Sequence, residues 1–146
     1  MNQEQVSETL EIQRLVGKIS NLEGNPAEQK NFFTRDVQLR IYMGEEMVLE
    51  IRGIANFEKG LKPFTTMIKR VHYINGQHVI DFLTKDKATG LLFCHAIHVT
   101  EENGQSFITK HYIYNEDIYE KNRNGIWLVK ARDAHYHISD KHVLGM

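Results

Sequence analysis

The spacing of apolar residues near the start of the chain is helical. Between residues 3 and 23 they recur mostly at three- and four-residue steps, which places them on one stripe of an amphipathic helix. Gly24 is expected to end this helix. The stretch Asn25-Pro26-Ala27-Glu28 has the N-cap, first-position proline and capping-box glutamate that begin another helix. The sequence therefore predicts a long first helix and a short second one that carries Phe32 and Phe33.

Alternating apolar and polar residues follow, and they predict strands. Residues 37–41 and 47–52 alternate on either side of Gly44, which is typical of a hairpin. Helical spacing returns between Gly53 and Arg70, where Pro63 is expected to break or kink a third helix.

The remainder of the chain has the pattern of long strands joined by tight turns. Strands are predicted over residues 71–83, 89–101, 106–120 and 126–137, with turns at Lys85-Asp86-Lys87, Asn103-Gly104 and Asn124-Gly125. Asn75-Gly76 lies inside the first of these strands and predicts a bulge or a break. Helices first and hairpins last predict an α+β fold, with the helices packed on one face of an antiparallel sheet.

Composition and charge fit one compact domain. The 146 residues suit a single core, so we expect one domain over residues 1–146, with its core at 8–138 and a short flexible C-terminal tail. The formal net charge is −1 and neither sign forms a run, which argues against a nucleic-acid partner. No apolar stretch approaches bilayer length and no signal-peptide core is present, so a cytoplasmic protein without membrane contact is expected. Cys94 is the only cysteine, which excludes an intramolecular disulfide.

Three segments resemble one known family when they are taken with the order of elements. They are Phe33-Thr34-Arg35-Asp36-Val37, Asp86-Lys87-Ala88-Thr89-Gly90, and the stretch from Gly125 to Arg132 that reads GIWLVKAR. Together they resemble the SnoaL-like branch of the nuclear transport factor 2-like superfamily over residues 8 to 138. That superfamily includes scytalone dehydratase, ketosteroid isomerase, polyketide cyclases, bile-acid dehydratases and limonene epoxide hydrolase.

The resemblance implies a cone-shaped α+β barrel, in which about three helices pack over the concave face of a strongly bent, mixed sheet. It also implies an apolar pocket for a small hydrophobic molecule, no cofactor, and a homodimer formed through the outer sheet face. Residues 126–129 are all apolar, although successive residues of a strand point to opposite faces. We therefore expect both faces of this strand to be buried. Because members of the superfamily share a pocket more than a reaction, the residues must identify the chemistry.

The resemblance also suggests a catalytic histidine. Dehydratase-like relatives place a His after the third helix and pair it with an Asp near the end of the first, and His72 matches that His. Imidazole titrates near neutral pH and suits proton abstraction. The Asp position, however, falls on Leu22, or on Asn21 with a one-residue shift. Asn21 could orient His72 through its amide, and Asp81 or Glu50 are alternative bases.

Other residues match pocket positions of scytalone dehydratase. His98 is in phase with Leu92, Cys94 and Ala96, so it is predicted to point inward with them and to be a second catalytic residue. Tyr42 and Asn115 are predicted to bind substrate, although a one-residue slip would turn either to the other face. Arg132 resembles an Arg near the end of the family's sequences, and a salt bridge explains it equally well.

A metal site is not expected. His135, His137 and His142 lie close in sequence, but no carboxylate set with fixed spacing accompanies them, and frayed C-terminal exposure explains them better. His95 and His98 differ in parity and point to opposite faces of a strand.

Three hypotheses for function result. The first is a cofactor-free lyase or isomerase, such as a dehydratase, acting on a small hydrophobic cyclic or polyketide-like molecule with His72 as base. The second is a non-catalytic binding protein that has lost the family Asp. The third is a structural partner in a larger assembly.

Overall fold

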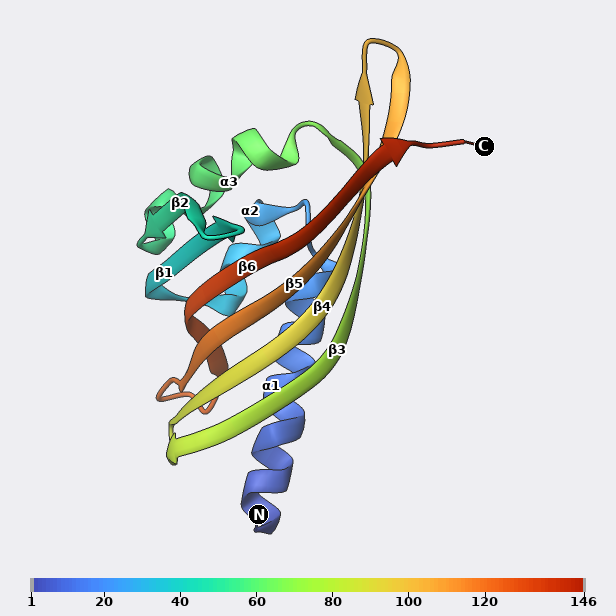
Figure 1. Cartoon of the computed structure of the whole chain (residues 1–146). Helices are drawn as coiled ribbons and strands as arrows, with labels where there is room; N and C mark the ends of the chain where they lie inside the picture. The colour runs from blue at the N-terminus through green and yellow to red at the C-terminus, as the bar shows by residue number, and fades with distance from the viewer. Residues whose placement is uncertain (1, 146) are drawn as a thin grey trace.

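A curved sheet carries helices on one of its faces (Figure 1). The computed structural model describes residues 2–145. Its helical elements are α1 (Gln3–Asn21), α2 (Pro26–Gln29), the 3-10 turns η1 (Lys30–Phe32) and η2 (Ile54–Asn56), and α3 (Phe57–Thr65). Its strands are β1 (Phe33–Met43), β2 (Glu46–Arg52), β3 (Ile68–Thr84), β4 (Lys87–Glu102), β5 (Gln105–Lys121) and β6 (Trp127–Val143). The predicted α+β class and the order of its elements are confirmed.

The first helix forms where the apolar stripe predicted it. Four of its residues are buried and lie on one face of the helix: Ile12, Leu15, Val16 and Ile19. The side chain of Asn2 caps it by accepting a hydrogen bond from the Gln5 N–H at 2.8 Å. The second helix is shorter than predicted, because the chain extends at Phe33 and this residue begins β1 instead. α3 continues through Pro63 and ends two residues later, so the proline marks its last turn rather than a break.

The sheet is mixed because the first and last strands are neighbours. Its six strands lie in the order β2-β1-β6-β5-β4-β3, with β1 and β6 parallel and every other pair antiparallel. The bulge predicted at Asn75-Gly76 is present, since the register shifts between Asn75 and His78 against β4. β6 continues to Val143, which pairs with Phe107, so the last strand is longer than the predicted range 126–137.

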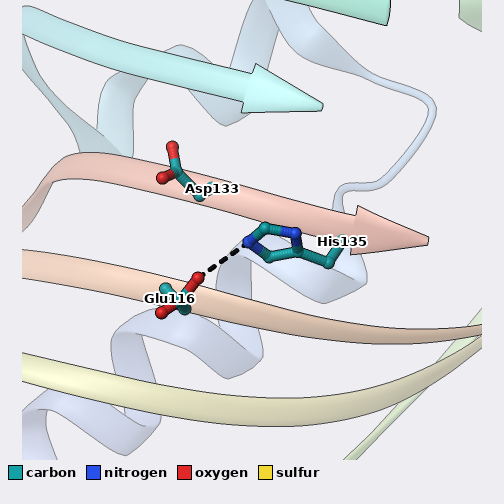
Figure 2. Close-up of side chains that lie close together, drawn as sticks. All are labelled: Glu116, Asp133 and His135. Atoms are coloured by element: carbon teal, nitrogen blue, oxygen red, sulfur yellow. Dashed lines mark hydrogen bonds and ion pairs between the residues drawn. The ribbon is translucent and has the colours of Figure 1, made fainter. Parts of the chain in front are cut away.

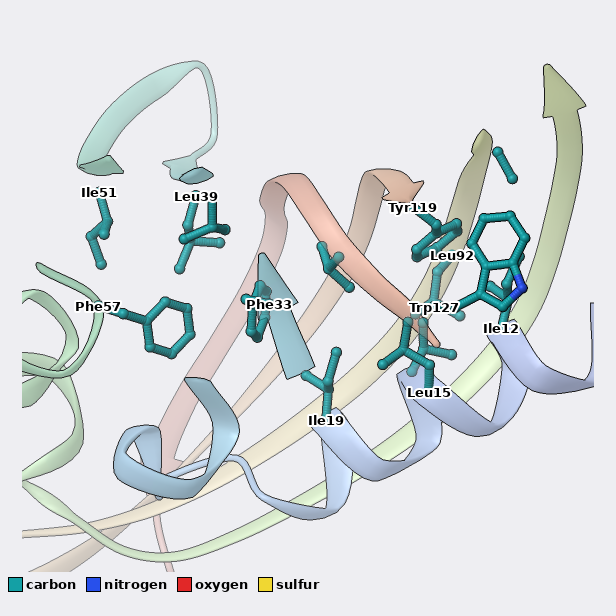
Figure 3. Close-up of a cluster of buried hydrophobic side chains, with 14 residues drawn as sticks. Ile12, Leu15, Ile19, Phe33, Leu39, Ile51, Phe57, Leu92, Tyr119 and Trp127 are labelled. Carbon is teal, nitrogen blue, oxygen red and sulfur yellow. The ribbon is translucent and has the colours of Figure 1, made fainter. Parts of the chain in front are cut away.

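The core occupies only part of the space between helices and sheet. In Figure 3, α1 residues Ile12, Leu15 and Ile19 pack toward Leu92, Tyr119 and Trp127 of the sheet, and Phe33 and Phe57 continue the cluster toward α3. A smaller cluster on the same face contains Cys94, Ala96 and Ile113, with Tyr73 and Tyr136 against it. Four of those five residues border a cavity, so the smaller cluster forms the floor of the site described below. Within residues 2–145, no helix is long and apolar enough to cross a membrane.

Candidate functional site

A cavity of about 340 Å³ lies between the concave face of the sheet and the helical elements. Small-molecule sites in proteins typically span roughly 300–1,000 Å³ and are mainly apolar with a few converging polar groups. Phe33, Leu39 and Ile113 are among the apolar lining residues of this cavity. Its polar lining includes Glu23, Tyr73, His98, His111, Asn115, Arg132 and Tyr136. The cavity therefore places a small set of titratable groups in apolar surroundings.

Glu23 brings a carboxyl group into the cavity from the turn that follows α1. The Glu23 N–H donates to the Ser20 carbonyl at 3.3 Å, and Gly24 turns the chain in a left-handed conformation with φ 90°. Burial raises the pKa of Glu23 from its ordinary value of 4.5 to about 7, although the charge of Arg132 and a hydrogen bond from Gln29 oppose this. The carboxyl group can therefore accept or donate a proton near neutral pH.

Two tyrosines and a histidine form a chain of contacts across the cavity floor. The Tyr73 hydroxyl lies 3.3 Å from the Tyr136 hydroxyl and 3.3 Å from Nε2 of His98. Burial, followed by the charge of Glu23, raises the pKa of both phenols, so both stay protonated at neutral pH. Burial and the neighbouring His111 lower the pKa of His98 to about 4, which keeps its imidazole neutral.

A second histidine lies beside His98. The two rings of His98 and His111 meet edge to face, with centroids 4.9 Å apart. Nδ1 of His111 contacts the Ser139 hydroxyl at 2.6 Å, and burial lowers the pKa of this imidazole as well. Both rings therefore offer hydrogen-bonding groups without charge.

A buried ion pair supports the cavity from below. Arg132 donates to both carboxylate oxygens of Asp117, at 2.7 and 2.8 Å, and the Tyr119 hydroxyl also donates to Asp117 at 2.7 Å. Nε2 of His78 lies 2.9 Å from that hydroxyl. Burial alone would lower the pKa of Arg132, but Asp117 raises it above the usual value. Because the cavity-lining guanidinium is neutralised by Asp117, Glu23 meets a cation whose charge is largely compensated.

The predicted pair of His72 and Asn21 is not in the cavity. His72 is exposed, whereas its neighbours Val71 and Tyr73 line the cavity, so its side chain points to the opposite face of β3. Asn21 is exposed at the end of α1 and does not line the cavity. The predicted placement of both residues in the cavity is wrong, and for His72 the error is one of strand parity.

Tyr42 is also on the outer face. Ile41 and Met43 line the cavity, while the Tyr42 ring stacks on His135 with centroids 4.7 Å apart. The register of β1 against β2 shifts between Ile41 and Tyr42, which is the slip that the sequence left open. The alternative bases Asp81 and Glu50 are exposed outside the cavity, and Glu50 is paired with Arg40 at 3.0 Å.

His98 and Asn115 do line the cavity. His98 alternates with the buried residues Leu92, Cys94 and Ala96 of β4, and Asn115 of β5 pairs with Leu92. Asn115 is 5% exposed and its amide donates to the Cys94 thiol at 3.9 Å. Their proposed roles with a substrate stay predictions. Arg132 is both a cavity residue and a salt-bridge residue.

Sequence reasoning missed Glu23, Tyr73 and Tyr136. For Glu23 the available signal was a carboxylate immediately before a helix-ending glycine. For Tyr73 the signal was parity, because it alternates with the exposed His72 and pairs with the buried Ala96. For Tyr136 no signal stood out, since it lies at the end of the last predicted strand, among histidines that were attributed to C-terminal exposure.

A different group of ligand-type side chains lies on the outer face (Figure 2). Among residues 2–145, Glu116, Asp133 and His135 are the one trio of such residues whose potential ligand atoms lie within 4.8 Å of one another. Nε2 of His135 lies 2.8 Å from Oε1 of Glu116, and the His135 ring is stacked between Tyr42 and Tyr114. A surface hydrogen bond and ring stacking therefore account for the arrangement of His135. His137 and His142 are not part of it.

Comparison with solved structures shows which fold this is. A candidate scytalone dehydratase from Novosphingobium aromaticivorans DSM 12444 is 20% identical over 99% of this chain and 94% of its own, with a TM-score of 0.81. Hexachlorocyclohexane dehydrochlorinase LinA-type3 from Novosphingobium barchaimii LL02 is 12% identical over 95% and 92%, with a TM-score of 0.78. The β subunit of a candidate aromatic-ring-hydroxylating dioxygenase from N. aromaticivorans DSM 12444 is 13% identical over 92% and 91%, with a TM-score of 0.73.

These similarities show that the chain shares the fold of these structures, and the predicted fold is confirmed at that level. No protein-family model and no curated protein matches the sequence. Since the structural relatives named above include two enzyme types and a subunit of a larger enzyme, the fold does not select an activity.

Proposed function

We propose that this protein is an acid/base lyase or isomerase acting on a small hydrophobic cyclic molecule, with Glu23 as its proton-transferring group. The observation that carries the proposal is a carboxyl group with a pKa of about 7 in an apolar cavity. A general base works best when its pKa is close to the working pH, and an ordinary glutamate is too weak a base for this.

The neighbouring groups fit an elimination. Glu23 takes a proton from the carbon next to a substrate carbonyl, the electron pair of that C–H bond forms the new double bond, and the C–O bond to the leaving hydroxyl breaks. The departing oxygen takes the proton from Glu23 and leaves as water, which restores the carboxylate. Tyr73 and Tyr136 are neutral phenols that can donate hydrogen bonds to the carbonyl or leaving oxygen. Their 3.3 Å contacts are long for O–H donors, so either hydroxyl can be redirected to a substrate with little loss.

The names of two structural relatives are consistent with this class. One is described as a dehydratase and another as a dehydrochlorinase, and both names denote removal of a small molecule H–X from a substrate. In our proposal Glu23 takes the part that the sequence analysis assigned to His72, and His98 positions the Tyr73 hydroxyl.

A direct test uses 3-hydroxy-1-tetralone, a cyclic β-hydroxy ketone that loses one water to give fluorescent 1-naphthol. We expect the wild type to accelerate this reaction, and Glu23→Gln to lower kcat by about 10²- to 10⁴-fold. Tyr73→Phe should lower kcat by about 10²-fold, since it removes one donor without changing the shape of the ring. Glu11→Gln, on an exposed position of α1, is the matched control.

The alternative is a non-catalytic binding protein that uses the same cavity. Binding of the tetralone to wild type and Glu23→Gln with equal affinity, with no naphthol formed by either, would favour this alternative. Turnover that is unchanged in Glu23→Gln would remove Glu23 from the mechanism.

A further inference from the structure

A second hollow of about 280 Å³ adjoins the cavity. The two share the lining residues Phe64, Ile68, His98 and His111, so these side chains lie at the border between them. The first two come from α3 and the start of β3, and the histidines come from the sheet. The concave face of the sheet therefore continues from the cavity into the second hollow.

The strand register explains how this face changes along its length. On the cavity floor, Cys94 lies opposite Ile113, and Ile113 opposite Tyr136. Further along the same strands, His98 lies opposite Thr109, and Thr109 opposite Lys141. All three members of this second row line the second hollow, and we call them the polar row. Between the two rows Ala96 lies opposite His111, and His111 opposite Ser139, so the face changes stepwise into one that carries an imidazole, a hydroxyl and an ammonium group.

The polar row has no net charge. Nζ of Lys141 lies 2.6 Å from Oε2 of Glu102, so the ammonium charge is compensated. His98 and His111 are neutral because burial lowers the pKa of both. The residues that face the row from the other side, Pro63, Phe64 and Met67, are uncharged. An anionic group here would meet Glu102 and a cationic one would meet Lys141, whereas a neutral hydroxyl meets donors and acceptors without a charge penalty.

We propose that the natural ligand is amphipathic, with an apolar ring system in the cavity and a neutral hydroxyl-bearing arm that passes between Phe64 and His98 to the polar row. Thr109, at the centre of the row, is the residue that selects this arm. The inference deepens the proposed function, since the same molecule occupies the cavity. It concerns binding, however, and does not require Glu23.

The test is a fluorescence titration with two naphthalene probes that share one skeleton. 4-(1-Naphthyl)butan-1-ol carries a terminal hydroxyl and 1-butylnaphthalene lacks it. Thr109→Val keeps the side-chain shape and removes its hydrogen-bonding group. We expect Thr109→Val to weaken binding of the alcohol about five- to tenfold and to change binding of 1-butylnaphthalene less than about twofold. Thr89→Val, at a β4 position outside both hollows, should change neither affinity.

Three results would overturn the inference. Equal losses for both probes in Thr109→Val would mean that the arm does not reach the polar row, and absence of binding by both would mean that the cavity does not hold such rings. Tighter binding of 4-(1-naphthyl)butanoate than of the alcohol, lost in Lys141→Gln, would indicate an anionic arm. The titration measures binding and uses no variant of Glu23, so a failure of the proposed catalysis leaves this test intact.

Discussion

Replacing Glu23 by Gln should make the protein more stable at alkaline pH and leave it nearly unchanged at acid pH. A carboxyl group whose pKa is higher in the folded protein favours the folded state while both states are protonated, and this advantage is lost as the pH rises through the folded pKa. The difference between about 7 in the folded protein and 4.5 in the unfolded chain corresponds to about 3 kcal/mol. Most of this falls between pH 5 and pH 8.

The wild type alone would not reveal this effect, because His98 acts in the opposite direction. Its pKa is lowered from 6.5 to about 4, so its contribution to stability is present above 6.5 and is lost as the pH falls toward 4. Between pH 8 and pH 5 this costs about 2 kcal/mol, which nearly cancels the gain from Glu23. Comparing variant with wild type at each pH removes the shared contribution of His98.

The assay is urea unfolding of wild type, Glu23→Gln and the control Glu11→Gln at pH 5 and pH 8. The stability advantage of Glu23→Gln should be larger by about 2–3 kcal/mol at pH 8 than at pH 5, with an unchanged dependence on urea. Glu11→Gln should show no such difference. An advantage of equal size at both pH values would show that the Glu23 carboxyl group titrates normally, and the argument for its catalytic role would fail with it.

Three further predictions concern other parts of the fold. Asp117→Asn leaves the buried Arg132 without a counter-charge and should lower the free energy of unfolding by about 3–5 kcal/mol in urea, and a loss below about 1 kcal/mol would contradict a buried pair. Gly90→Ala places a Cβ 2.6 Å from the buried Tyr119 ring and should cost about 1–3 kcal/mol in the same assay, and an unchanged stability would contradict the close approach. The predicted homodimer through the outer face should appear in sedimentation equilibrium and dissociate in Tyr114→Glu, whereas a monomeric wild type would exclude it.

The fold was predictable because its determinants are periodic and redundant. The stripe of α1, the capping sequence at Asn25 and the turns at Asn103-Gly104 and Asn124-Gly125 each specify an element locally. A wrong boundary, such as the early end assigned to β6, changes no neighbouring element. The parallel pairing of β1 with β6 joins residues about ninety positions apart, and no local pattern specifies it.

The site was less predictable because its residues depend on parity and on turn geometry. A shift of one residue exchanges the two faces of a strand, so His72 and Tyr73, or Ile41 and Tyr42, are equally plausible from sequence. Their assignment requires the bulge between Asn75 and His78 and the register shift in β1. His98 was placed more easily, because three small or apolar residues in phase with it fixed the buried face of β4.

The carboxyl group itself illustrates a further reason. The resemblance expected an Asp within the last turn of the first helix, where this chain has Asn21 and Leu22. Glu23 lies beyond the helix, and its side chain has one methylene more than Asp. The left-handed turn at Gly24 and the longer side chain together bring its carboxyl group among Tyr73, Tyr136 and Arg132. Matching residue types position by position therefore misses a carboxyl group that reaches the cavity from a different backbone position. A search of the structure for titratable groups buried in an apolar cavity finds it directly.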